Sequence, residues 1–214
     1  MNGIEAIGAL HDPLRQRLYE FVAAQGRDVS RHEAAEACGI QRTLAAFHLD
    51  KLVEAGLLET SYRRLSGRAG PGAGRPAKLY RRTTVEHLVS VPPRAYDLAS
   101  SVLAEALERA GADRELAAAA HQAGHAIGAS ASDEPLGDVL RRQGYEPYDD
   151  NGEVRLRNCP FHQIAERFPP LVCGMNLALC EGVLAGMGVA DRRARLDPHP
   201  GECCVVIGSK NSRT

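Results

Sequence analysis

Apolar residues recur at helical spacing in two stretches of the N-terminal part of the chain. The first is residues 4–25, where Asp12-Pro13 predicts that the main helix begins near Pro13. Ser30, with Glu33 three residues later, forms a capping box and predicts a second, short helix. A third helix is expected from Gln41 to Ala55-Gly56, where Gly56 ends it. We expect its apolar face to consist of Leu44, Phe47, Leu52 and Val53, with Leu49 shared.

Two strand-like segments follow the third helix. Residues 57–62 and 77–81 have strand composition, and the basic, glycine-rich residues 64–76 between them are typical of a hairpin tip. Two short helices joined by a tight glycine-containing turn, followed by such a hairpin, predict a winged helix-turn-helix domain. We place this domain at residues 1–91.

The charge pattern indicates a polyanion partner for this domain. The whole chain has a net charge of -1, and residues 1–92 contain 13 Lys+Arg against 10 Asp+Glu. Within them, residues 60–82 contain seven basic and no acidic residues. A local basic stripe on a nearly neutral protein is typical of phosphate contacts, although a solvated loop has the same composition.

A winged helix domain places the start of its third helix in the major groove of double-stranded DNA. Gln41, Arg42 and Thr43 are therefore expected to meet base edges, because Arg and Gln donate in patterns that match guanine and adenine. A palindromic operator would require a homodimer. The remaining candidate DNA contacts, expected at phosphates or in the minor groove, are His48, which could equally be a packing residue, Arg63, Arg64, Arg68, Arg75 and Lys78.

The segment Phe47–Leu58, FHLDKLVEAGLL, resembles the recognition helix of bacterial winged-helix repressors of the ArsR and DeoR type. The resemblance covers residues 10–85. It implies a transcriptional repressor that binds DNA.

The middle of the chain, residues 92–131, is expected to be helical. Pro92-Pro93 stops any continuous helix, and helices are predicted over residues 94–110 and 114–130. The second is alanine-rich and allows close approach, so we expect a dimerisation segment here, with an intrachain hairpin as the alternative. His121 and His125 stand at i, i+4 and could chelate a metal, but no third ligand is nearby in sequence.

Five of the six cysteines lie in the C-terminal residues 132–214, for which we expect a small α/β sensor domain and hence an α+β protein. A chain of 214 residues with 44% hydrophobic residues can build a core without disulfides. No secretory signal and no run of about 18 apolar residues is visible, so we expect a cytoplasmic protein without a membrane segment. Clustered reduced thiols bind metal or perform redox chemistry.

Three thiolates are expected to converge. Cys159 ends a strand, Cys173 lies in the first turn of a helix begun by Pro169-Pro170, and one of Cys203 and Cys204 joins them, since neighbours in a strand point to opposite faces. Cys180 is expected to be a small buried residue. The fourth ligand is left open between His162, His199 and an exogenous group. Both zinc and a [4Fe–4S] cluster fit this ligand count.

Residues 158–207 resemble the C-terminal part of SufR-type repressors of iron–sulfur assembly operons. The matching residues are Cys159, the segment Phe168-Pro169-x-x-Val172-Cys173, and Cys203 with Ile207 four places on. The resemblance implies that Cys203 serves in place of Cys204 and that an iron–sulfur cluster controls DNA affinity. The cyanobacterial pattern has one more cysteine, which is absent near Met187.

No phosphate-binding loop or nucleophile–base pair is evident, apart from the adjacency of His162 to Cys159, and we expect no enzymatic activity. A C-terminal domain that binds a small molecule is the remaining alternative.

Overall fold

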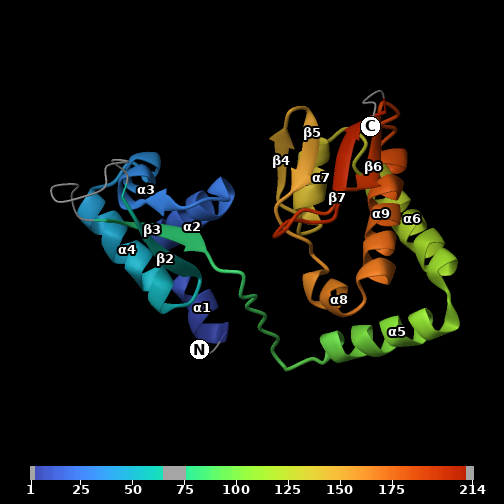
Figure 1. Cartoon of the computed structure of the whole chain (residues 1–214), viewed down its shortest axis with the longest axis horizontal. Coiled ribbons are helices and arrows are strands. Elements are labelled where there is room, and N and C mark those ends of the chain that lie inside the picture. The colour runs from blue at the N-terminus through green and yellow to red at the C-terminus, as the bar shows by residue number, and fades with distance from the viewer. Residues whose placement is uncertain (1–2, 65–75, 211–214) are drawn as a thin grey trace. The chain divides into compact units, whose positions relative to one another are not determined.

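The computed structural model describes residues 3–64 and 76–210. It divides the chain into two compact units, residues 1–94 and 95–214. Both units mix helices and strands, as expected for an α+β protein (Figure 1). Because each has its own core, each is described by itself.

The described residues of the first unit form a winged helix-turn-helix fold. Its sheet is antiparallel, in the order β1-β3-β2, with Thr60 opposite Tyr80. The helices are α1 (Gly3–Ala9), α2 (Pro13–Gln25), α3 (Arg31–Cys38) and α4 (Arg42–Glu54), and the strands are β1 (Val29–Ser30), β2 (Leu58–Arg63) and β3 (Ala77–Arg82).

Local chemistry sets the helix ends in this unit. The Asp12 carboxylate caps α2 by accepting hydrogen bonds from two backbone N–H groups of the first turn, at 2.9 and 3.1 Å. Ser30 and Glu33 form the capping box of α3, with hydrogen bonds of 3.2 and 2.8 Å. Gly56 follows α4 with φ 70°, a left-handed conformation that favours glycine. These ends are the ones predicted.

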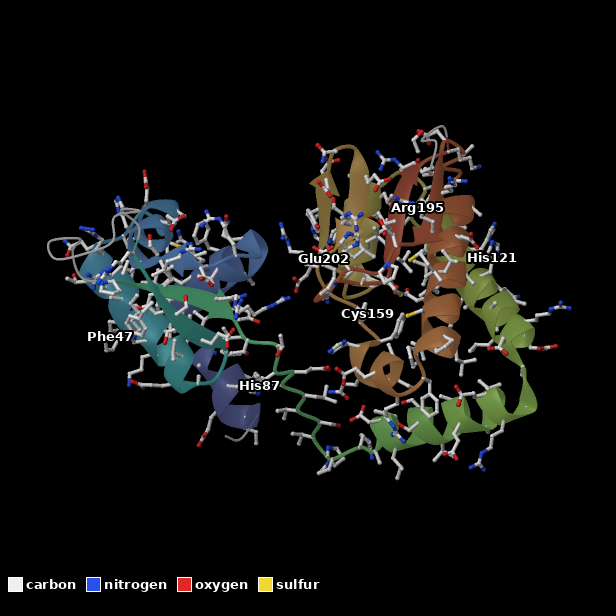
Figure 2. All side chains as sticks on the ribbon, viewed as in Figure 1. Phe47, His87, His121, Cys159, Arg195 and Glu202 are labelled. Atoms are coloured by element: carbon white, nitrogen blue, oxygen red, sulfur yellow. The ribbon has the colours of Figure 1, made fainter. Side chains whose placement is uncertain are left out.

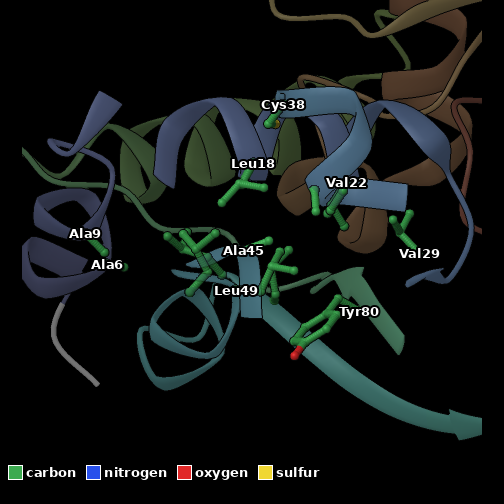
Figure 3. Packing of buried hydrophobic residues seen from close by; sticks show 14 residues of the cluster. Ala6, Ala9, Leu18, Val22, Val29, Cys38, Ala45, Leu49 and Tyr80 are labelled. Atoms are coloured by element: carbon green, nitrogen blue, oxygen red, sulfur yellow. The ribbon is translucent and has the colours of Figure 1, made fainter. Parts of the chain in front are cut away.

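The core of the first unit lies where α2, α3 and α4 meet the sheet (Figure 3). Leu18, Leu49 and Leu52 are fully buried, and Tyr80 is nearly so. Burying a leucine side chain stabilises a fold by roughly 1.5–3 kcal/mol. One face of α4 is therefore anchored in the core, and its other face is free to contact a ligand.

The second unit is built around a four-stranded antiparallel sheet in the order β4-β5-β7-β6. Helix α9 packs against β6 and β7 and also against α6. At its N-terminal end α9 contacts α8, and α8 in turn contacts α5 (Figure 1). The helices are α5 (Tyr96–Ala110), α6 (Asp113–Ala129), α7 (Leu136–Arg142), α8 (His162–Arg167) and α9 (Pro169–Gly186), and the strands are β4 (Pro147–Asp150), β5 (Glu153–Leu156), β6 (Arg192–Leu196) and β7 (Val205–Ser209).

Helices α6 and α9 touch backbone to backbone. A Cβ atom at Gly124 or Gly128 of α6 would lie 2.1 or 2.2 Å from a carbonyl oxygen of α9. The relation is mutual, because a Cβ atom at Gly182 or Gly186 would lie 2.2 Å from a carbonyl oxygen of α6. Four glycines, paired at i, i+4 on each helix, thus allow this contact. The buried face of α6 is therefore used within the chain.

Helix α9 is long and apolar enough, by length and composition alone, to cross a membrane, with a mean hydropathy of 1.3 over its 18 residues. The sequence did not single it out, because Asn176 and Glu181 interrupt the apolar run. Eight of its residues are buried, and it packs against α6, β6 and β7. Such packing is that of a core helix.

Candidate functional site

The start of α4 presents polar side chains to solvent. Gln41 is the N-cap residue, and its side chain makes no capping hydrogen bond. Gln41, Arg42 and Thr43 are all exposed. Their side chains are therefore available to a partner, as major-groove contact requires.

The predicted apolar face of α4 was wrong in part. Leu44 is 42% exposed and Phe47 is 58% exposed, with Phe47 on the outer side of the helix (Figure 2). The buried residues are Ala45, Leu49 and Leu52, at i, i+4 and i+7. Since successive residues turn by about 100°, Leu44 lies to one side of this stripe and Phe47 nearly opposite it. Both share the exposed surface with Arg42 and Thr43.

Two other candidate DNA contacts, His48 and Lys78, contact side chains of the same unit. His48 is half-buried beside the ring of Phe47, and its Nδ1 atom is buried without a hydrogen-bond partner among the described residues. Lys78 donates a hydrogen bond of 2.7 Å to Asp50, which also accepts one of 2.9 Å from Tyr80. Lys78 thus connects the hairpin to α4 and is less free than its position in the sequence suggested.

The hairpin carries the remaining basic candidates. Arg63 ends β2 and is exposed, as is Arg64 directly after it. Arg68 and Arg75 lie outside the described residues. Of the hairpin candidates, Arg63 and Arg64 are therefore the ones that the structure presents to solvent.

The second candidate site is a group of thiols in the second unit. Cys159 follows β5, Cys173 lies in the second turn of α9 and not the first, and Cys203 and Cys204 directly precede β7. Cys159 and Cys204 both pack against the core cluster that contains Cys203. The thiols of Cys159 and Cys204 each interact with that of Cys203, and the thiol of Cys173 interacts with that of Cys204. The structure thus brings together the three predicted ligands and Cys204; we call these four residues the thiol cluster. Figure 2 shows Cys159 beside α9.

Asn176 is the residue that sequence reasoning missed. It is fully buried in α9, and its amide Nδ2 donates to the sulfur of Cys203 at 3.2 Å and contacts that of Cys159 at 4.0 Å. Its Oδ1 accepts hydrogen bonds from Tyr145 at 2.5 Å and from Cys180 at 3.8 Å. Cys173, Asn176 and Cys180 follow at i, i+3 and i+7, a polar stripe on an apolar helix that could have revealed it.

Interactions among the thiols favour ionisation of one of them. The neighbouring thiols of Cys159 and Cys204 hold the pKa of Cys203 well below its ordinary value, although burial opposes this. The pKa values of Cys159 and Cys204 are raised, chiefly because each interacts with Cys203 and also because of burial. Burial raises the pKa of Cys180 to about 12. Cys203 is therefore the sulfur best prepared to act as a thiolate, the form that binds metals.

The candidate histidines have other partners. His162 is exposed and lies 3.2 Å from Glu166 on the same helix, and His199 is exposed and lies 3.7 Å from Asp197. His121 and His125 are both exposed on α6. Over residues 3–64 and 76–210, no three His, Cys, Asp or Glu side chains stand ready around one metal position. The thiol cluster thus fits a metal group by the type and number of its sulfur donors, and not by a preformed coordination geometry.

Residues 10–61 match a protein family described as a helix-turn-helix domain. The match runs from the residues before α2 into β2 and includes α3 and α4. Together with the fold, it identifies this part of the chain as a helix-turn-helix domain, the DNA-binding class of transcriptional regulators. No curated protein and no solved structure matches the chain.

Proposed function

We propose that the protein is a homodimeric transcriptional repressor that binds a palindromic operator and whose affinity for DNA is controlled by an iron–sulfur cluster held at Cys159, Cys173 and Cys203. The observation that carries the DNA-binding part is the helix-turn-helix match, with the start of α4 exposed. The thiol cluster supports the sensing part. The location that fits this function is the cytoplasm.

The exposed surface of α4 suits a major groove. Gln41 and Arg42 can read adenine and guanine through paired hydrogen bonds. Leu44 and Phe47 add an apolar surface that suits thymine methyl groups. Arg63 and Arg64 would lie along the phosphates.

The thiol cluster has the donors that iron–sulfur clusters and zinc prefer. When bound, an iron–sulfur cluster would supply a centre that responds to oxidants. The chain's own part is to hold the sulfurs in place. Asn176 fixes Cys203 through its amide, and Tyr145 fixes Asn176 in turn. Zinc in the same thiols is the second candidate, because the donor set does not distinguish the two metals.

Helix α5 supports the proposal of a homodimer. Leu98, Val102 and Leu103 are each more than half exposed, whereas Ala104 on the other side is buried against α8 and α9. An apolar helix face of this kind suits a second copy of the chain, and a twofold dimer matches a palindromic operator. Sedimentation of the full chain tests this, and a monomer would refute it.

One experiment tests both DNA binding and the control of DNA affinity by the cluster, and it uses protein purified without oxygen. Duplexes selected from a random library are titrated with holo and apo protein, and binding is followed by fluorescence anisotropy at several salt concentrations. We expect affinity to fall linearly with salt on logarithmic axes and holo protein to bind more tightly than apo protein. Equal affinity of the two forms would refute control by the cluster. If no duplex sequence is selected, the proposal that the protein is a transcriptional regulator is refuted.

A further inference from the structure

The pair Cys203-Cys204 does not behave as neighbours in a regular strand. Strand β7 begins only at Val205, and the chain bends at Cys204. The two thiols lie close enough to influence each other's ionisation. The premise of the expectation that only one of them serves, a regular strand with the two side chains on opposite faces, therefore does not hold here.

Cys204 lies between two of the proposed ligands. It packs against the core cluster that contains Cys203, and its thiol interacts with those of Cys203 before β7 and Cys173 on α9. It is half-buried, so it is neither a surface thiol nor an inert core residue like Cys180, which is 1% exposed. Cys204 thus connects Cys203, which neighbours Cys159, with Cys173 on α9.

The competing histidine ligands are directed elsewhere. His162 and His199 are exposed, and both are next to carboxylates, Glu166 and Asp197. Arg155 also contacts the Nδ1 atom of His199, at 3.0 Å. Recruiting either imidazole to the thiols would require it to leave these partners, whereas Cys204 already packs against the core cluster that contains Cys203.

We propose that Cys204 is the fourth protein ligand of the thiol cluster, which then binds its iron–sulfur cluster through four cysteine thiolates. This rests on the proposed function, and it removes the need for a histidine or an exogenous ligand. Four thiolates are a common ligand set for iron–sulfur clusters. The adjacent pair supplies two of them, and the rest of the cluster supplies one from the end of β5 and one from α9.

The test compares alanine variants of the full chain purified without oxygen. Iron, sulfide and zinc per chain are measured together with the visible absorption and electron paramagnetic resonance spectra, and circular dichroism confirms folding. We expect Cys204→Ala and Cys173→Ala each to lose most of their iron and sulfide. His162→Ala and His199→Ala should keep the wild-type content and spectra. Cys180→Ala is the matched control, a buried thiol outside the cluster.

The outcomes separate the two proposals. Wild-type metal content and spectra in Cys204→Ala, with loss in His162→Ala or His199→Ala, would overturn the ligand assignment and leave the iron–sulfur site standing. A wild-type protein that takes up neither iron nor zinc would overturn both. Zinc in place of iron, lost in Cys204→Ala, would overturn the iron–sulfur cluster and support Cys204 as a ligand.

Discussion

The contact between α6 and α9 makes a sharp prediction for a single methyl group. In Gly182→Ala, the new Cβ atom would lie 2.2 Å from the carbonyl oxygen of His121 and 2.9 Å from the backbone nitrogen of His125. Neither obstacle is a side chain that could rotate away. Relieving the overlap requires the helices to separate locally by about 1 Å, and a gap of that size forfeits roughly a quarter to a half of the dispersion energy of each contact it opens.

We expect Gly182→Ala to lower the free energy of unfolding by about 3 kcal/mol, the upper part of the range for overpacked cores. This loss includes the intrinsic preference of a helix for alanine over glycine, about 1 kcal/mol in the opposite direction. Gly174→Ala is the matched control on the same helix, because no heavy atom lies within 4 Å of its Cβ position. It should stabilise the protein by roughly 0.5–1 kcal/mol.

The assay is urea denaturation of the full chain followed by far-ultraviolet circular dichroism, with midpoints and slopes compared. The two alanine variants should move the transition in opposite directions. If Gly182→Ala unfolds at the wild-type midpoint or above it, the backbone contact does not exist in solution and the reasoning is refuted.

Three further predictions concern buried side chains and a helix cap. Leu49→Ala should cost about 2–5 kcal/mol of stability and Phe47→Ala less than about 1 kcal/mol, since Leu49 is fully buried and Phe47 is exposed; equal losses in denaturation would contradict this placement. The capping-box hydrogen bond holds the pKa of Glu33 below its ordinary value. The stabilisation that ionised Glu33 gives the fold is therefore complete above the unfolded pKa of about 4.3 and is lost as the pH falls through the lower folded value. The denaturation midpoint of Glu33→Gln should fall less steeply than that of wild type between about pH 5 and 3. Asn176→Leu leaves the Tyr145 hydroxyl without its amide partner and should cost roughly 1–3 kcal/mol; in a double-mutant cycle with Tyr145→Phe, strictly additive losses would show that the hydrogen bond is absent.

The parts of the fold that the sequence predicted are those set by local chemistry. Asp12, Ser30 with Glu33, and Gly56 act on backbone groups within a few residues, so their effect is visible from spacing alone. The winged helix was predicted from the short helices that these ends define and from the hairpin that follows them, and the family match supports its helix-turn-helix part.

The parts that were missed depend on neighbours distant in sequence. Leu44 and Phe47 fit a helical period, but only the positions of α2 and the sheet decide which stripe of α4 is buried. Strand β6 was not anticipated because its sequence is rich in arginine. In the structure, Arg195 donates to Glu153 on β5 at 2.9 and 3.0 Å, so charge is accommodated by a partner two strands away.

The thiol cluster combines both cases. Grouped cysteines identified the region, and Cys180 is buried in the core, as expected. The roles of Asn176 and Cys204 depend on how α9 and the start of β7 meet, which spacing along the chain does not encode. The four glycines of α6 and α9 are likewise informative only once the two helices are known to be partners.

The glycine contact also has a mechanical consequence. Where side chains separate two helices, a small displacement of one is absorbed by rotamer changes and does not travel far. At the crossing of α6 and α9 the backbones touch, and no rotamers are available to absorb motion. A shift of α9 caused at Cys173 is therefore expected to displace α6 with it at this crossing.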